Sequence, residues 1–280
     1  MLKVQILVDN VANAGPGEWG FSAIIEADGQ RILFDTGASD LFRKNADTLG
    51  QNLLQLDFVA LSHGHWDHTW GLGELVRLYL KNHEAKRPTI IAHPRTFERT
   101  LNPKGAENGP LLSLDSLQDR FPLNLTAEPL WITENLLWLG EIKRKFAFEY
   151  VEPKSKRIVD GVNEPDLSPD DTALVYRTPE GIVIITGCSH SGICNIIDQA
   201  MDLTGDDRVL DIIGGTHLLQ IGQLRMKATL DYFASIKPKA LHIGHCTSFD
   251  AKVALAAVAD MKELFVGLEV KFEDEGVLGS

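Results

Sequence analysis

Short apolar runs separated by polar turns occupy the first hundred residues, and they predict strands with a few helices between them. Asp28-Gly29 separates two such runs and is a strong signal for a hairpin turn. Gly50 follows a helix-like segment and is placed to end it. The segments expected to be strands are 2–8, 21–27, 31–34, 58–61 and 89–92, and those expected to be helices are 38–49 and 72–82.

The pattern becomes regular again after residue 172, where strand-like and helix-like segments alternate. Such alternation is typical of an α/β layered fold, in which residues at the carboxyl ends of strands build the functional site. His63, Cys188, His217 and His245 all follow expected strands. In this part we expect strands at 173–177, 182–186, 208–213 and 240–243, and helices at 193–203, 223–235 and 251–264.

Residues from about 98 to 170 are less regular. They mix proline and glycine with Trp131, Trp138 and short apolar runs, which indicates irregular structure plus a few strands. Because neither a linker nor an internal repeat is evident, we expect a single domain over residues 1–280, with 98–170 as an insertion over the core. Insertions of this kind commonly determine substrate specificity.

The composition is that of an ordinary globular protein, with 44% hydrophobic and 24% charged residues in a chain of 280. The 27 basic and 39 acidic residues give a net charge of −12, which disfavours nucleic acid as a partner. Lys143–Lys145 and Lys154–Arg157 are local basic segments. Each of them is either a solvated face or a patch that meets an anionic substrate.

The cysteines are sparse and odd in number, Cys188, Cys194 and Cys246, which is not the pattern of a disulfide framework and fits a reducing compartment. The apolar runs are much shorter than the roughly 20 residues that a membrane helix needs, so a membrane is not an expected partner. The chain opens on a strand-like run without the basic and apolar regions of a signal peptide. We therefore expect a cytoplasmic protein.

Four residues with metal-binding side chains lie within six positions, directly after the expected strand 58–61. They are His63, His65, Asp67 and His68. The first two can bind one ion, and the other two can face a neighbouring ion, while Gly64 lets the backbone bend between the first pair. Imidazoles with a carboxylate suit Zn²⁺ and also Fe or Mn, whereas the alternative is a polar surface cluster without metal.

The segment Ser62–His68 resembles the signature of the metallo-β-lactamase superfamily, and Phe34–Gly37 is similar to the strand end that precedes that signature. Further segments resemble one subfamily, which includes metal-dependent hydrolases and 7,8-dihydropterin-6-methyl-4-(β-D-ribofuranosyl)aminobenzene-5′-phosphate synthases. These segments are 8–10, 186–193, 213–218 and 245–247. The resemblance implies an αββα sandwich, in which two mixed sheets lie face to face with helices outside and a dinuclear metal site at one edge.

The resemblance also implies a ligand for the second ion, and the end of the expected strand 182–186 offers one for the first ion. His245 corresponds to the last histidine of the superfamily and is expected to bind the second ion with Asp67 and His68. His190 is expected to complete the first ion's set, although the superfamily usually carries this histidine before the strand, where this chain has Pro169–Thr172. Asp170 or Asp171 is therefore an alternative third ligand.

Cys188 stands where many relatives have an aspartate that binds metal. A thiol close to a metal ion loses its proton and can act as a ligand. The alternative is a small buried residue, which is the most common role of a free cysteine. Asp35 is expected to orient a ligand histidine or the backbone.

Asp67 and His217 are the candidate catalytic residues. Asp67 is expected to orient the nucleophile and carry its proton, and His217 to donate a proton to a leaving group or to bind substrate phosphate. A histidine that is merely hydrogen-bonded at a strand end is the alternative for His217.

Three further residues are assigned to substrate binding. Asn10 lies in a segment that resembles the subfamily. Trp66, with Trp70 and Trp19 nearby in signature segments, forms either an aromatic wall for the substrate or part of the core. Arg144 falls where relatives carry a Gly-Glu-Ile-Pro-Arg-like motif and is a candidate contact for phosphate or carboxylate.

These assignments favour a hydrolase with two divalent ions, zinc first and manganese or iron next, acting on an ester, lactone or phosphoester of a small molecule. The substrate is expected to be phosphorylated or aromatic. The alternative is a transferase that joins an arylamine to a dihydropterin methyl diphosphate. A mononuclear iron dioxygenase and a non-catalytic binding protein are further alternatives, while the net charge counts against a nucleic-acid hydrolase.

Overall fold

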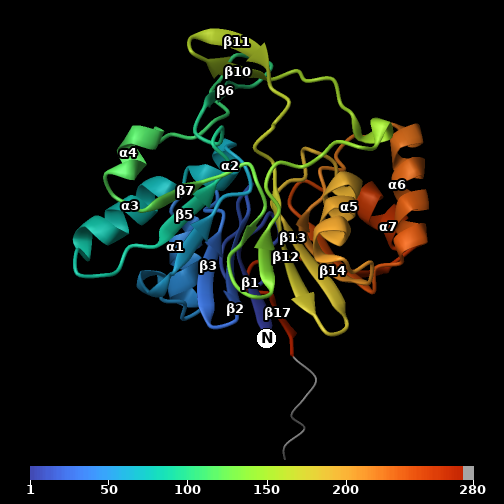
Figure 1. Cartoon of the computed structure of the whole chain (residues 1–280), viewed down its shortest axis with the longest axis horizontal. Helices are drawn as coiled ribbons and strands as arrows, with labels where there is room; N and C mark the ends of the chain where they lie inside the picture. Colours follow the sequence, from blue (N-terminus) through green and yellow to red (C-terminus); the bar gives the residue numbers. More distant parts are fainter. Residues whose placement is uncertain (274–280) are drawn as a thin grey trace, which may run out of the picture.

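The computed structural model describes residues 1–273 and consists of two seven-stranded mixed sheets packed face to face, with helices on both outer surfaces (Figure 1). The expected αββα sandwich is confirmed. The first sheet has the order β17 (Glu269–Phe272), β1 (Leu2–Val8), β2 (Ser22–Ala27), β3 (Gln30–Phe34), β4 (Phe58–Ala60), β5 (Thr89–Ala92) and β7 (Leu123–Leu125). The second has the order β16 (Asp260–Glu263), β15 (Ala240–Gly244), β14 (Val209–Gly215), β13 (Gly181–Thr186), β12 (Ala173–Thr178), β9 (Leu136–Trp138) and β8 (Leu130–Trp131).

The helices divide between the two outer surfaces (Figure 1). Beside the first sheet lie α1 (Leu41–Thr48), α3 (Leu72–Lys81) and α4 (Leu114–Gln118), and beside the second lie α5 (Ile193–Thr204), α6 (Gln223–Ile236) and α7 (Phe249–Leu255). Three short turns of helix are α2 (Trp66–Thr69), η1 (Leu53–Gln55) and η2 (Ala147–Glu149). Among the described residues, every helix is too short or too polar to span a bilayer.

The strand β13 (Gly181–Thr186) is largely apolar because both of its faces are buried. Val183 and Ile185 belong to the core between the sheets, whereas Ile182 and Ile184 belong to the core beneath the helices of the second sheet. Successive side chains of a strand point to opposite faces, so a strand that is covered on both faces needs apolar residues at every position.

The chain segment 251–264, expected to be a single helix, is divided in the structure. The helix α7 ends at Leu255, and Asp260–Glu263 forms the edge strand β16, which pairs in parallel with β15. Met261 packs against the core beneath the helices, while Leu264 lies in the core between the sheets. An extended chain places these two residues on opposite faces of a sheet, which a continuous helix outside the sheet does not.

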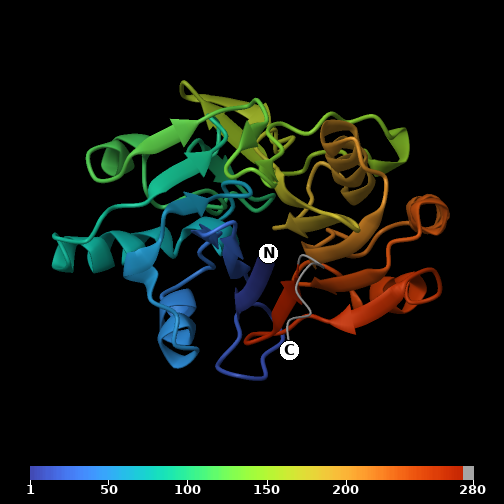
Figure 2. The ribbon, with the colours of Figure 1, turned by 60° about the horizontal axis from the view of Figure 1, so that its bottom comes forward.

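The segment 98–170 is divided as well. Its strands β7, β8 and β9 join the two large sheets, so this part is not an insertion over the core. The remainder includes a three-stranded sheet formed by β6 (Arg99–Leu101), β10 (Lys156–Val159) and β11 (Val162–Pro165), called the small sheet below. It stands above one edge of the sandwich, opposite the end where the chain begins (Figures 1 and 2).

Candidate metal centre

The structure brings together, as expected, three possible metal ligands: His63, His65 and His190. They are called the first ligand group below. The Nδ1 atom of His65 lies 3.1 Å from Nε2 of His63 and 3.0 Å from Nε2 of His190. His63 follows β4, and His190 lies between β13 and α5. Three imidazole nitrogens so close together cannot all share protons with one another, whereas their lone pairs can all face one cation. The geometry therefore fits a metal ion.

A second ligand group consists of the metal-binding atoms of Asp67, His68, Cys188 and His245. The Nε2 atoms of His68 and His245 are 3.2 Å apart, and the Cys188 sulfur lies 3.3 Å and 3.2 Å from them. A carboxylate oxygen of Asp67 is 3.4 Å from Nε2 of His245. All four side chains are buried, and a carboxylate, a thiol and two imidazoles are a suitable donor set for zinc.

Asp35 contacts a histidine of the second ligand group, the kind of contact that the sequence predicts for it. Its Oδ2 atom lies 2.6 Å from Nδ1 of His68, and Oδ1 accepts a hydrogen bond of 2.7 Å from the Ser62 backbone. The Ser62 hydroxyl donates to the same carboxylate and lies 2.9 Å from Nδ1 of His63. The Nδ1 atoms of both histidines are thus engaged on the outside, which leaves their Nε2 atoms to face the ligand groups.

Burial and neighbouring charge favour the metal-binding forms of His63, His190 and Asp67. In His65 and His245, neighbouring acidic groups outweigh burial and raise the pKa values instead. Burial, together with the surrounding histidines, holds the pKa values of His63 and His190 well below the ordinary value. Burial alone would raise the pKa of Asp67. The charges of His68 and His245 outweigh burial and hold this pKa below its ordinary value. Neutral imidazoles and an ionised carboxylate are the forms that bind metal.

The carboxylates of Asp170 and Asp171, the alternatives to His190, are engaged elsewhere. Asp170 accepts a hydrogen bond of 2.7 Å from the backbone of Gly64, and Asp171 accepts one of 2.8 Å from the backbone of Ser191. Neither is a member of a ligand group among the described residues. Gly64 also leaves no room for a side chain, because a Cβ atom there would lie 2.1 Å from the Thr96 carbonyl oxygen.

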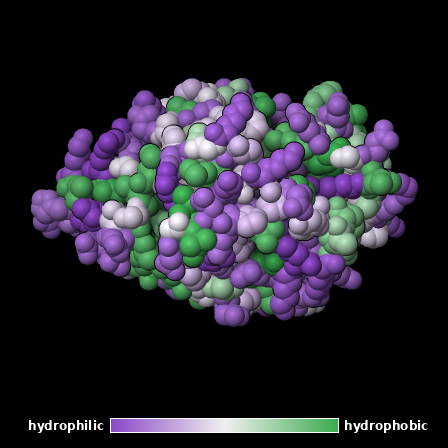
Figure 3. Space-filling model, turned by 90° about the horizontal axis from the view of Figure 1, so that it is seen from above, coloured by the Kyte–Doolittle hydropathy of each residue, from purple (hydrophilic) through white to green (hydrophobic). Residues whose placement is uncertain are grey.

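A cavity of about 420 Å³ opens beside both ligand groups. The small sheet and its connections line one side through Asn102, Lys154 and Ser155. Several apolar residues on its wall are exposed to solvent: Trp19, Val151 and Leu167. Seen from the side of the small sheet, hydrophobic residues form separate areas within a hydrophilic surface (Figure 3).

His217, the candidate catalytic residue, and Trp66, a candidate substrate-binding residue, both line this cavity. The ring of His217 lies 4.1 Å from that of His190, and its Nδ1 atom is buried without a hydrogen-bond partner. His217 also forms a third group of possible ligands with Cys188 and His190. Trp19 lines the cavity as well, whereas Trp70 donates to the carbonyl of Gly109.

Asn10 and Arg144 have structural contacts. The side chain of Asn10 donates a hydrogen bond of 2.8 Å to the His245 carbonyl and does not line the cavity. Arg144 does line it, but its guanidinium donates to the carbonyls of His190, Leu167 and Ser168. Both residues therefore contact the backbone of loops that carry candidate metal ligands.

Sequence reasoning missed Asp9, Asp166 and Arg157. Asp9 accepts a hydrogen bond of 2.8 Å from the backbone of His245, and its only sequence signal was its place in a segment that resembles the subfamily. Arg157 belongs to the basic segment Lys154–Arg157, yet it is only 2% exposed and lies between carboxylates. No spacing in the sequence links it to Asp166.

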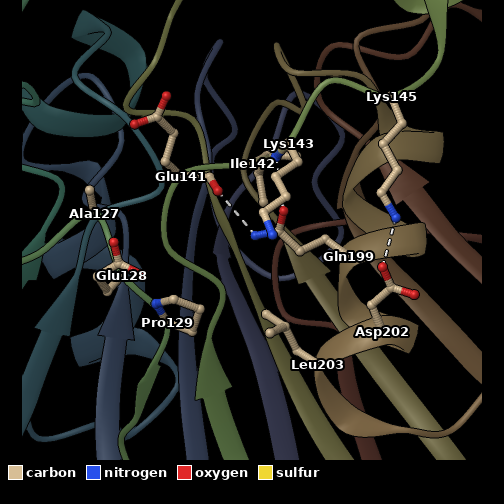
Figure 4. A pocket seen from close by; sticks show the side chains of 10 residues that line it. All are labelled: Ala127, Glu128, Pro129, Glu141, Ile142, Lys143, Lys145, Gln199, Asp202 and Leu203. Carbon is tan, nitrogen blue, oxygen red and sulfur yellow. Dashed lines mark hydrogen bonds and ion pairs between the residues drawn. The ribbon is translucent and has the colours of Figure 1, made fainter.

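A second cavity of about 420 Å³ lies away from these histidines. Figure 4 shows Lys145 paired with Asp202 on its wall, and Gln199 donating to the backbone of Glu141. The buried amide of Gln199 also donates to the carbonyl of Leu139 and accepts from the backbone of Lys143. The cavity beside the ligand groups is therefore the candidate active site.

Residues 20–200 match the family model of the metallo-beta-lactamase superfamily. The chain is 31% identical over 267 residues to the uncharacterized protein MJ0448 of Methanocaldococcus jannaschii, covering 90% of this chain and 93% of that protein. It is 28% identical over 297 residues to a 7,8-dihydropterin-6-methyl-4-(beta-D-ribofuranosyl)-aminobenzene-5'-phosphate synthase of the same organism, covering 97% of each chain.

Among solved structures, Tm1679, a metal-dependent hydrolase of the beta-lactamase superfamily, aligns with a TM-score of 0.83 and 26% identity. The alignment covers 98% of this chain and 100% of that one. A diphosphatase from the PhnP family aligns over 97% of each chain with a TM-score of 0.52 and 16% identity, which shows a shared fold.

Proposed function

Because the chain belongs to the metallo-β-lactamase superfamily, we propose that it is a hydrolase with two divalent metal ions, acting on an ester, lactone or phosphoester of a small molecule. Zinc is the first candidate, with manganese and iron next. The observation that carries this proposal is the placement of two ligand groups beside one cavity, each with its atoms within 4.8 Å of one another.

The ions, when bound, supply Lewis-acid polarisation of the substrate and lower the pKa of water. The residues of the chain orient the nucleophile, transfer protons and contact the substrate. Asp67 is buried and ionised at the cavity wall, where it can orient a nucleophilic water and hold its proton. His217 has an unpartnered Nδ1 atom at the same wall and can donate a proton to the leaving group. Trp19, Trp66 and Leu167 offer apolar surface to an aromatic substrate.

A second candidate is the transferase reaction, in which an arylamine attacks a dihydropterin methyl diphosphate and diphosphate leaves. The similarity to the synthase over 97% of each chain favours it. The two reactions differ in the nucleophile, water or amine, so the same acid and base can serve both. The cysteines are unpaired and buried, which supports a reducing, cytoplasmic location for either activity.

The decisive experiment removes the metal ions with a chelator and restores them one metal at a time. Each form is assayed on aryl esters, lactones and phosphoesters, and in parallel on an arylamine with a dihydropterin methyl diphosphate. Hydrolysis that disappears with the metal and returns with zinc, manganese or iron supports the first proposal. Condensation without hydrolysis favours the transferase. Activity that survives complete removal of metal would overturn both.

A further inference from the structure

Arg157 is the central residue of a buried ion-pair network next to the first ligand group. It extends from β10 of the small sheet, and its Nε atom lies 3.1 Å from Oδ1 of Asp166. Its Nη2 atom pairs with Oδ1 of Asp170. The three side chains are 3% exposed or less. A buried guanidinium is costly unless it is paired, so these carboxylates are its required partners.

The other oxygen of Asp166 faces a candidate metal ligand. Its Oδ2 atom lies 3.5 Å from Nε2 of His65, a charge contact rather than a hydrogen bond, and both atoms are buried without a hydrogen-bond partner. The opposite nitrogen of the same ring, Nδ1, is the one that faces His63 and His190. A ligand histidine must carry its proton on the nitrogen that does not face the metal, and a carboxylate beside that nitrogen favours this tautomer.

Asp170 connects the same arginine to the backbone between the first two ligands. Its Oδ2 atom accepts the hydrogen bond from Gly64, which lies between His63 and His65. Arg157 also donates a hydrogen bond of 2.6 Å to the carbonyl of Arg95, just after β5. Arg157 of the small sheet is thus linked through Asp166 to the ring of His65 and through Asp170 to the backbone of Gly64.

We propose that Asp166 is a positioning residue that fixes the tautomer of His65, and that Arg157 holds Asp166 in place and ties the small sheet to the metal centre. The inference rests on the proposed function, because it requires His65 to bind an ion. It goes further, because it links two features: the small sheet, which lines one side of the substrate cavity, and the affinity of the first ligand group for its ion.

The test is Asp166→Asn, which keeps the size of the side chain. The amide can still accept from Arg157, but it then directs an NH₂ group toward His65 and favours the wrong tautomer. We expect the zinc affinity of the first ligand group to fall by about 10- to 100-fold, measured by competition with a chromophoric chelator. The affinity of the second ligand group should not change.

The matched control is Asp160→Asn, the same change at an exposed position in the turn between β10 and β11. It should leave both affinities unchanged. Equal zinc affinities in Asp166→Asn and the unmodified protein would overturn the inference while leaving the proposed function intact. If the unmodified protein binds no metal at all, the proposed function fails instead.

A second measurement needs no variant, so it remains decisive even if Asp166→Asn fails to fold. Nitrogen-15 spectra of the zinc-loaded protein, labelled at histidine, report which ring nitrogen carries the proton. His65 should carry it on Nε2, in slow exchange with water. A proton on Nδ1 of His65, or a rapidly exchanging one, would contradict a role for Asp166 in positioning this ring.

Discussion

The two ligand groups lie side by side but differ in charge. The first consists of histidines alone, and burial with the neighbouring histidines lowers the pKa values of His63 and His190. The second contains the ionised carboxylate of Asp67 and the thiol of Cys188. A divalent ion gains more charge neutralisation among anionic ligands, so the second group should hold its ion more tightly. We therefore expect the first group to depend more on outer contacts such as Asp166.

The largest effect is expected from Asp67→Ala, which removes the anionic oxygen ligand of the second group and the proposed proton carrier. We expect turnover to fall by roughly 100- to 10,000-fold and the second ion to be lost while the first stays bound. Metal analysis and initial rates measure both effects. Asp47→Ala, at an exposed position of α1, is the control. Full activity with both ions retained would refute the role of Asp67.

A smaller effect is expected from His217→Gln, because this residue lines the cavity without being needed for either ligand group. We expect kcat to fall by about 100-fold with both ions retained. The exposed His83→Gln serves as the control. Loss of an ion from the His217 variant would instead make this histidine a ligand together with Cys188 and His190.

Cys188→Ser tests the difference in charge between the groups directly. We expect the affinity of the second group for zinc to fall by about tenfold or more, because serine keeps the size but not the thiolate. Cys194→Ser alters a cysteine that packs in the core beneath the helices, and it should change stability but not metal content. Unchanged zinc affinity in Cys188→Ser would show that Cys188 is a small buried residue and not a metal ligand.

The smallest effect is expected from Lys154→Met. Lys154 lines the cavity and has no ion-pair partner among residues 1–273, whereas the guanidinium of Arg144 is occupied by carbonyls. We expect KM for an anionic substrate to rise about threefold to tenfold with kcat unchanged. Lys143→Met, in the other basic segment, is the control. An equal KM for both variants would exclude Lys154 as an anion contact.

Much of the candidate site could be predicted because its signals are local. His63, His65, Asp67 and His68 come from one short segment after one strand, so their spacing alone indicates shared ligation. His245 is implied by the resemblance to the superfamily, whereas His190 is indicated by its place after the expected strand 182–186. The structure places both beside the expected partners.

What could not be predicted depends on contacts between distant segments. The sequence predicts that Arg157 belongs either to a solvated face or to a patch that meets an anionic substrate. Only the position of the small sheet brings it between Asp166 and Asp170. The segment 251–264 has the composition of a helix, yet pairing with β15 extends its second half. In both cases tertiary contacts outweigh the local pattern.

The metal content of the protein purified without added metal, measured by elemental mass spectrometry, shows directly whether the chain holds two ions. Two ligand groups in one chain predict about two zinc, manganese or iron ions per chain. About one iron ion per chain would instead indicate a mononuclear oxygenase, and no metal would indicate a binding protein, so either result would contradict a dinuclear hydrolase.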